Sequence, residues 1–346
     1  MKILCLAVFL SMLLSRNVYA QGAELPNVWL CEQEDMYTYQ DMQTDLHLLQ
    51  KTYPGFVHVD GIGTTMDGRT LYHIVIGSEN AQNHVLIFGS IHAREYMTTQ
   101  LVMKLTKDFI EGLGTENHQY KGKTYLELLE NTAVHVVPMV NPDGVTLSQF
   151  GLNGMKKEST RKKIYEIYEL DSAIELEPYL KKWKSNAEGV DINRNFDALW
   201  DQYNDHLGHP SSDHYKGVFA GSTEEARALI SLTEQYKFKR TISYHAQGEV
   251  IYWYFGQQGG LLEESRKFAQ SISEITGYAL DSNYEKLDPA GYKDWAIKEK
   301  GIVGLTIEVG TGEVPLDESL FSLIYIQNEK VIPETLLSLN EDAVTE

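Results

Sequence analysis

Short apolar segments and longer amphipathic segments alternate along this chain. The short segments are rich in Val and Ile and are bounded by Gly, Asn or polar residues, so each of them predicts a β-strand. The strands are expected at Leu71–Ile76, His84–Phe88, Ala133–Val137, Thr241–Tyr244, Val250–Tyr254 and Val303–Val309.

Between these runs, apolar residues recur at three- and four-residue spacing, which predicts amphipathic helices. A start signal stands at Gly221–Glu225, where a hydroxyl can cap the first amides and acidic residues favour the positive end of a helix. Strands that alternate with helices indicate an α/β fold with a largely parallel sheet. The helices are expected at Tyr96–Gly112, Thr223–Tyr236, Leu261–Gly277 and Ser319–Leu339.

The length of 346 residues would allow two domains. The least regular region is Gly151–Glu188, where charged residues cluster and an amphipathic pattern follows around Ile174–Leu180. We interpret this region as a long surface excursion of a single domain, because the candidate functional residues run from His92 to Glu308 and must converge.

The first twenty residues have the pattern of a secretory signal peptide. Lys2 is followed by an apolar run from Ile3 to Leu14, and a polar stretch then ends at Ala20, after which cleavage is expected. That run is too short to cross a bilayer comfortably. The mature protein is therefore expected to be secreted or cell-wall-associated, with no membrane span.

The net charge of the chain bears on its possible partners. The formal net charge of -19 argues against nucleic acid and anionic membrane as partners. A solvated acidic surface explains the excess of acidic residues equally well.

Cys5 lies in the predicted signal, so Cys31 is expected to be the only thiol of the mature chain, which then has no intrachain disulfide.

The stretch "GSIHAREYMTT" places His92 and Glu95 just after the predicted strand that ends at Phe88, and His245 ends another predicted strand. In α/β sheets, functional residues gather beyond the carboxyl ends of strands. Two His and one carboxylate with an open fourth position form the ligand set of a hydrolytic zinc site. The alternatives are a chance HxxE pattern and a His245 that belongs to the core or to a loop.

Two further stretches carry candidate polar residues. "GVDINRNFD" places Asn193 next to Arg194, and "GLTIEVG" ends a very apolar strand with Glu308. Taken separately, Asn193 and Arg194 could be turn and surface residues, and Glu308 could be an acid that points to water from a strand end.

Taken in order, HARE, NPDG, GVDINRNFD, SYHAQ and GLTIEVG resemble the motifs of the zinc metallo-carboxypeptidases. The resemblance covers the chain from about residue 37 to the C-terminus, so it implies a short lead at 21–36 and a catalytic domain at 37–346. It also implies the fold of that family: a single domain with a mixed, largely parallel, twisted sheet and helices on both faces.

The resemblance implies roles for individual residues. His92, Glu95 and His245 would hold one Zn²⁺, although another divalent ion of similar preference would fit the same ligands. Glu308 would be the general base. Arg94 would help to hold the substrate near the metal.

Asn193 and Arg194 would bind the terminal carboxylate of the substrate, a task that suits the planar guanidinium. Digestive members of the family stabilise the oxyanion with an arginine that follows a Trp. In "KKWKSNAEGVDINRN" the residue at that place is Lys184. The alternative is a surface lysine at a basic helix end.

The motif "GYKDW" bears on the substrate. In the family, the residue two after its Gly lines the pocket for the terminal side chain, and here it is Lys293, which would favour a carboxylate over a basic group. The alternative is that Lys293 turns to solvent. At the position of the mobile tyrosine of digestive members, ungapped alignment with this motif places Lys286, and Tyr284 is two residues away.

The combination looks like the bacterial γ-D-glutamyl-diamino acid peptidases, which cut peptidoglycan stem peptides between γ-D-Glu and meso-diaminopimelate. Asp213 or Glu249 would then meet the amine of that side chain. An exopeptidase that removes acidic C-terminal residues from ordinary peptides is an alternative, and an inactive wall- or peptide-binding module is another. In each case the partner is a peptide, and the protein is expected to be a monomer.

Overall fold

The computed structural model describes residues 28–115, 117–173, 175–281, 283 and 287–345. The predicted signal peptide, residues 21–27 of the lead, Ile174, Tyr284 and Lys286 lie outside the described residues. In the described part of the chain, no helix is long and apolar enough to cross a membrane.

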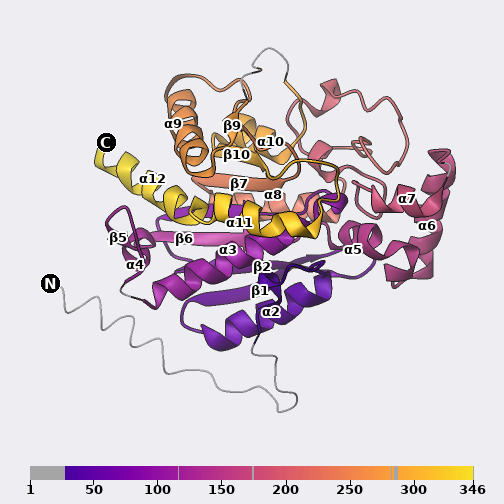
Figure 1. Cartoon of the computed structure of the whole chain (residues 1–346). Helices are drawn as coiled ribbons and strands as arrows, with labels where there is room; N and C mark the ends of the chain where they lie inside the picture. Colours follow the sequence, from indigo (N-terminus) through magenta and orange to yellow (C-terminus); the bar gives the residue numbers. More distant parts are fainter. Residues whose placement is uncertain (1–27, 116, 174, 282, 284–286, 346) are drawn as a thin grey trace.

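A mixed sheet of eight strands forms the centre of the molecule (Figure 1). Its inner strands β6, β3, β7 and β10 are parallel to one another, whereas β1, β2 and β8 join it by antiparallel pairing. In spatial order the strands are β1 (Val57–Thr64), β2 (Thr70–Ile76), β6 (Thr132–Val137), β3 (Asn83–Phe88), β7 (Arg240–His245), β10 (Val303–Glu308), β8 (Val250–Tyr252) and β9 (Ala279–Leu280).

Both faces of the sheet are buried under helices, as expected. Along β3, Val85 and Ile87 pack into one apolar cluster with α3 (Met97–Leu113) and α12 (Val331–Thr345), whereas Leu86 and Phe88 pack into another with α8 (Glu224–Tyr236). Burial on both faces explains why the inner strands are continuous apolar runs. The expected fold class, α/β with a mixed, largely parallel sheet in a single domain, is confirmed.

The predicted strands are all present, with ends that shift by a few residues. Three of the predicted helices correspond to α3, α8 and α9 (Gly259–Thr276). The prediction of one helix over Ser319–Leu339 is wrong, because α11 (Phe321–Asn328) ends before α12 begins at Val331. Pro333 explains the break: its ring would clash with the carbonyl of the residue four before it, so it is tolerated only in the first turn of a new helix.

The sequence analysis did not predict several elements, although it noted an amphipathic pattern where α7 lies. The edge strand β1 has two glycines and alternates poorly, and many of the remaining elements are short. They are β9, the hairpin β4 (Gln119–Tyr120) and β5 (Lys123–Thr124), the helices α2 (Tyr39–Thr52), α4 (Tyr125–Leu128), α5 (Pro142–Phe150), α6 (Glu158–Leu170), α7 (Leu176–Lys181) and α10 (Tyr292–Lys300), and the 3₁₀ turns η2 (Leu30–Glu32), η3 (Ala93–Glu95), η4 (Gly151–Gly154), η5 (Ile192–Arg194), η6 (Trp200–Gln202) and η7 (Glu318–Leu320).

The excursion between residues 151 and 188 contains α6 and α7, which lie together at one side of the molecule beside α5 (Figure 1). Its residues Ile164, Ile167, Leu180 and the fully buried Trp183 belong to a small apolar cluster that also contains Ala93 and Leu147 from the rest of the domain. The excursion is therefore packed rather than draped over the surface, and its end returns the chain to the carboxyl ends of the strands at Lys184.

Candidate active site

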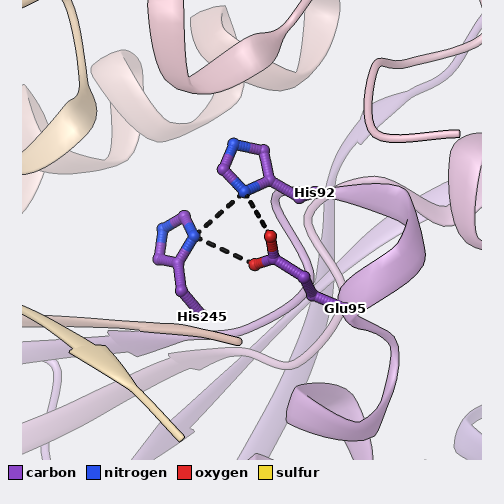
Figure 2. A group of neighbouring side chains, drawn as sticks. All are labelled: His92, Glu95 and His245. Atoms are coloured by element: carbon purple, nitrogen blue, oxygen red, sulfur yellow. Dashed lines mark hydrogen bonds and ion pairs between the residues drawn. The ribbon is translucent and has the colours of Figure 1, made fainter. Parts of the chain in front are cut away.

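The candidate metal ligands lie where adjacent parallel strands end. His245 is the last residue of β7, and His92 follows β3 and precedes the single turn η3, which carries Glu95. Figure 2 shows the three side chains pointing toward one another. His92 Nδ1 lies 2.8 Å from Glu95 Oε1, and His245 Nδ1 lies 3.1 Å from both His92 Nδ1 and Glu95 Oε2.

This cluster fits a zinc ion. The donor set is two imidazole nitrogens and a carboxylate, and all three residues are buried. Bonds of about 2.0–2.1 Å in a tetrahedral site hold ligand atoms a little over 3 Å apart, which is close to the observed separations. Burial alone would raise the pKa of Glu95, but His92 and His245 hold that pKa below its usual range. The carboxylate is therefore ionised, as a metal ligand must be.

Asp191 supports this cluster from behind, and the sequence analysis did not single it out. Its Oδ1 lies 3.2 Å from His92 Nε2, and its Oδ2 lies 3.0 Å from Lys184 Nζ. A carboxylate that accepts the Nε2 proton leaves the Nδ1 lone pair directed at the cluster. Burial would raise the pKa of Asp191, but Lys184 and His92 hold it well below its usual range. The place of Asp191 in "GVDINRN", two residues before Asn193, was the available signal.

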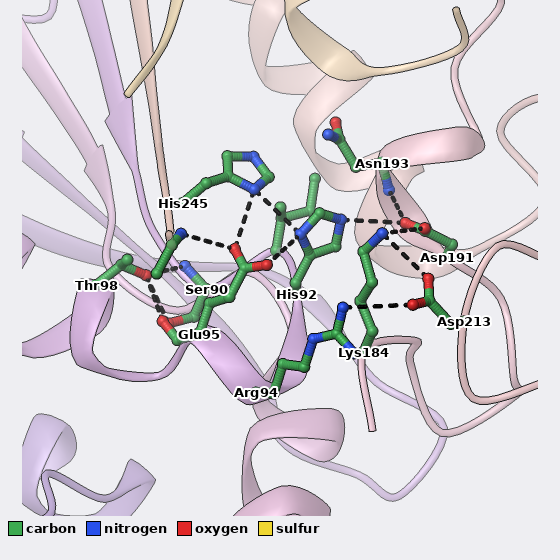
Figure 3. Close-up of polar contacts among 12 residues, drawn as sticks. Ser90, His92, Arg94, Glu95, Thr98, Lys184, Asp191, Asn193, Asp213 and His245 are labelled. Carbon is green, nitrogen blue, oxygen red and sulfur yellow. Dashed lines mark hydrogen bonds and ion pairs between the residues drawn. The ribbon is translucent and has the colours of Figure 1, made fainter. Parts of the chain in front are cut away.

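Lys184 is buried between two carboxylates, so the alternative of a surface lysine is wrong. Its Nζ lies 3.1 Å from Asp213 Oδ1 in addition to the contact with Asp191, and Asp213 also accepts a hydrogen bond from Arg94 Nη2 at 3.3 Å (Figure 3). Burial would lower the pKa of Lys184, but Asp191 and Asp213 raise it above its usual value. Lys184 is therefore a charged group beside the cluster.

The two acids considered for the substrate amine are engaged elsewhere. Asp213 is paired with Arg94 and Lys184, and Glu249 accepts a hydrogen bond from Gln327 Nε2 at 3.3 Å. Neither residue is among those that line the cavity at the site. That expectation is not met, because neither carboxylate lies in the cavity wall where a substrate amine could reach it.

Glu308 ends β10 and is the register partner of His245 in the parallel pair. Burial raises the pKa of Glu308 to about 7, against a smaller opposing effect of His245. A carboxyl group with a pKa near neutrality, one strand away from the metal cluster, is suited to accept a proton. Glu308 is half-buried and lines the cavity described below, so the alternative of a strand-end acid that points to bulk water does not hold.

Asn193 and Arg194 lie on the turn η5. The side-chain oxygen of Asn193 accepts a hydrogen bond from the Tyr292 amide at 3.0 Å, so its NH₂ group remains for other contacts. Arg194 Nη2 lies 2.5 Å from Asp288 Oδ2, and its guanidinium lies 5.0 Å from the centre of the Tyr203 ring. The Asp288 side chain is 67% exposed, so a carboxylate from solution can replace it.

Lys293 points inward, so the alternative that it turns to solvent is wrong. Its Nζ donates to Asp294 Oδ1 at 2.5 Å and to the Tyr254 carbonyl oxygen at 3.2 Å, and it lies over the Phe255 ring. The positions of Tyr284 and Lys286, which bear on the mobile tyrosine, lie outside the described residues.

A cavity of about 550 Å³ unites these groups. Nine of the candidate residues proposed from the sequence line it: His92, Arg94, Glu95, Lys184, Asn193, Arg194, His245, Lys293 and Glu308. The sequence analysis did not single out three acids in its wall, Asp281, Asp288 and Asp294. The cavity thus offers a candidate metal site, a base and several cations to one ligand.

Comparisons with known proteins show which sequences and structures this chain resembles. The sequence model of peptidase family M14, zinc carboxypeptidase, matches residues 42–336. The γ-D-glutamyl-L-diamino acid endopeptidase 1 of Lysinibacillus sphaericus is 32% identical over 292 residues, which are 84% of this chain and 69% of that protein. Protein YqgT of Bacillus subtilis (strain 168) is 31% identical over 314 residues, which are 90% of this chain and 80% of that protein.

Among solved structures, bovine thrombin-activatable fibrinolysis inhibitor in complex with tick carboxypeptidase inhibitor has the same fold. Its TM-score is 0.63 at 18% identity, over 89% of this chain and 99% of that chain.

Proposed function

This chain belongs to the zinc carboxypeptidase family, and we propose that it is a secreted, zinc-dependent peptidase that hydrolyses the γ-D-glutamyl–meso-diaminopimelate bond of peptidoglycan stem peptides. The observation that carries the proposal is that the candidate metal ligands, Arg194 and Lys293 line the same cavity, so that one bound peptide could contact all of them. The name of the Lysinibacillus sphaericus relative, which refers to a γ-D-glutamyl-L-diamino acid bond, supports the same substrate class.

His92, Glu95 and His245 would hold the zinc ion. When bound there, zinc acts as a Lewis acid and lowers the pKa of water. Glu308 accepts the proton of the attacking water and later passes it to the leaving amine. Lys184 presents a fixed ammonium group to the oxyanion, which is worth more in a water-poor cavity than in bulk solvent.

Asn193 and Arg194 would bind the free carboxylate of the terminal residue. The pair between Arg194 and the exposed carboxylate of Asp288 indicates how: a substrate carboxylate takes over the position of Asp288. Arg94, which lines the same cavity, contacts the peptide on the side of the metal cluster.

The side chain of diaminopimelate ends in both a carboxylate and an ammonium group. Lys293 suits the carboxylate, since Asp294 and the Tyr254 carbonyl hold its Nζ in the cavity wall. Asp281 replaces Asp213 and Glu249 as the candidate for the ammonium group. It lines the cavity, and its carboxylate caps the amide of Asn283 at 3.2 Å.

Export rests on the signal-peptide pattern of residues 1–20. The mature protein would begin after Ala20, with its catalytic domain at 37–346, and act as a monomer outside the cytoplasm or at the cell wall. Such a location gives the enzyme access to stem peptides.

A carboxypeptidase that removes acidic C-terminal residues from ordinary peptides is the second candidate, because Lys293 would also accept the carboxylate of Glu or Asp. An inactive binding module has less support, since the candidate base Glu308 is retained at the cavity wall.

A substrate series separates these candidates. L-Ala-γ-D-Glu peptides that end in meso-diaminopimelate, L-Lys or L-Glu are compared by kcat/KM, with Glu308→Gln as the inactive control. The proposal expects the diaminopimelate peptide to be cleaved at least about tenfold more efficiently, since the other two each lack one charged group of its side chain. Equal rates on the L-Glu peptide would assign the enzyme to acidic C-termini instead.

A further inference from the structure

The NPDG motif has no role in the chemistry described above, yet its asparagine contacts the backbone beside two residues of the site. Asn141 is fully buried at the start of α5. Its Oδ1 accepts a hydrogen bond from the Gly144 amide at 3.0 Å, and its Nδ2 donates to the carbonyl oxygens of Ile91 at 3.3 Å and Ser185 at 3.0 Å. One side-chain amide therefore joins three segments that are distant in sequence.

The two carbonyl acceptors flank functional residues. Ile91 directly precedes His92, and Ser185 directly follows Lys184. We propose that Asn141 is a positioning residue that holds the Lys184 segment in register with the turn that carries the metal ligands. The inference rests on the proposed function, specifically on the role of Lys184 at the oxyanion.

The Lys184 segment depends on such bonds because it belongs to no helix or strand. Helix α7 ends at Lys181, and η5 begins only at Ile192. Between them, the Lys184 carbonyl accepts a hydrogen bond from the Ala93 amide at 2.9 Å, and the Lys184 amide donates to the Ser212 carbonyl at 2.9 Å. These backbone bonds fix the segment, and Asn141 is the buried side chain that links it to Ile91.

The space around Asn141 leaves little freedom for it to move. A Cβ atom placed on Gly144 would lie 2.6 Å from both side-chain amide atoms of Asn141 and 2.7 Å from the Ser185 carbonyl oxygen. Glycine at position 144 thus allows the first turn of α5 to lie close to the Asn141 side chain and the Ser185 carbonyl. The Asn141 side chain is held between the helix start and the Lys184 segment.

A shift of the Lys184 segment would change the site directly. Lys184 Nζ contacts Asp191, whose other oxygen contacts His92 Nε2. A displacement of about 1 Å in a reacting constellation can cost roughly 100-fold in rate. We therefore expect loss of the Nδ2 contacts to lower kcat more than it raises KM.

A helix cap alone would not require asparagine. Ser and Asn cap helices about equally well, because either side-chain oxygen can accept the amide hydrogen. Serine, however, cannot donate to both Ile91 and Ser185. Asn141→Ser therefore retains the cap of α5 and removes the hydrogen bonds to the Ile91 and Ser185 carbonyl oxygens.

The test is a double-mutant cycle between Asn141→Ser and Lys184→Met in the full-length, zinc-loaded protein with L-Ala-γ-D-Glu-meso-diaminopimelate. Each single substitution is expected to lower kcat by roughly 10- to 100-fold. In the Lys184→Met background, Asn141→Ser should lower kcat by less than about threefold, because coupled residues are not additive. A retained kcat in Asn141→Ser, or fully additive losses, would overturn the inference.

Asn328→Ser is the matched control. Asn328 is another fully buried asparagine, whose Nδ2 donates to Tyr278 Oη at 3.0 Å and to the Ile324 carbonyl at 2.9 Å, and it does not line the cavity. It should lower the melting temperature and leave kcat unchanged. An equal loss of kcat in this control would assign the effect of Asn141→Ser to general destabilisation.

Two outcomes separate this inference from the role on which it rests. Full activity of Lys184→Met would overturn the role of Lys184 and the inference with it, whereas an impaired Lys184→Met with additive losses would overturn the inference alone. A crystal structure of Asn141→Ser tests the geometry without turnover: the separation of Lys184 Nζ from Asp191 should exceed the 3.0 Å seen here, and an unchanged segment would contradict the proposal.

Discussion

Glu308 and His245 are register partners at the carboxyl ends of the neighbouring parallel strands β10 and β7. This pairing places the candidate base one strand away from a candidate metal ligand without any loop between them. Rigid strands hold such groups more reproducibly than loops do. The relative position of base and metal is thus set by the hydrogen bonds of the sheet.

Replacement of the base is expected to abolish turnover and spare the metal. Glu308→Gln keeps the shape of the side chain but cannot accept the proton, so kcat should fall by about 100-fold or more. Zinc content, measured by elemental analysis, should remain at one ion per chain. Loss of zinc together with activity would show that Glu308 acts through the ligands instead.

Metal removal should lower both activity and stability. Because a ligand that binds only the folded state stabilises it by about 4 kcal/mol at a thousandfold excess over Kd, chelation should lower the melting temperature, and added zinc should restore it. His92→Ala should behave like the chelated protein. His58→Ala, which alters an exposed cluster of possible ligands with Asp60 and Glu79, is the control and should respond as the wild type does.

The two ends of the substrate side chain should be recognised separately. Lys293→Met is expected to lower kcat/KM for the meso-diaminopimelate peptide by roughly 10-fold or more, and Asp281→Asn should do the same by losing the ammonium contact. With an otherwise identical peptide that ends in L-Lys, only Asp281→Asn should reduce the rate, since that side chain has no carboxylate. A uniform loss on both peptides would argue against separate contacts.

A row of buried histidines should make the fold sensitive to acid. His135 lies 2.9 Å from both His73 and His84 through its two ring nitrogens, and burial lowers the pKa of His73 to about 4 and that of His135 to about 2. The unfolded chain binds these protons near pH 6.5 and the folded chain does not. The contribution of these histidines to the free energy of unfolding is therefore greatest above pH 6.5 and is lost as the pH falls toward 4.

Urea unfolding measures this effect. When the pH falls from 7 to 5, His73 and His135 should each lower the free energy of unfolding by about 2 kcal/mol. His73→Asn should flatten the pH dependence, and His47→Asn, at an exposed position, should not. An unchanged slope in His73→Asn would contradict the assignment.

The sequence was most informative where residues follow strands. His92, His245 and Glu308 were predicted at strand ends, and parallel pairing brings those ends together. What could not be predicted was the pairing of charged side chains across the fold. Asp213 and Arg94 are 119 residues apart, so their contact depends on the course of the irregular segment between η6 and α8, which has no sequence pattern that fixes it.

Some features could not be predicted because the sequence pattern around them is weak or misleading. The apolar pattern of Ser319–Leu339 continues through the break between α11 and α12, and only Pro333 indicates it. The polar edge strand β1 has no such pattern, because solvent covers much of it. Asp191 was overlooked since its role depends on a buried contact with His92 rather than on spacing.

The most direct test of the central claim is product analysis by mass spectrometry. The purified, zinc-loaded protein is incubated with L-Ala-γ-D-Glu-meso-diaminopimelate, beside a peptide that ends in L-Glu, with Glu308→Gln in parallel. We predict release of free meso-diaminopimelate by the wild type and none by the variant. Release of L-Glu from the second peptide with the first left intact would contradict the claim.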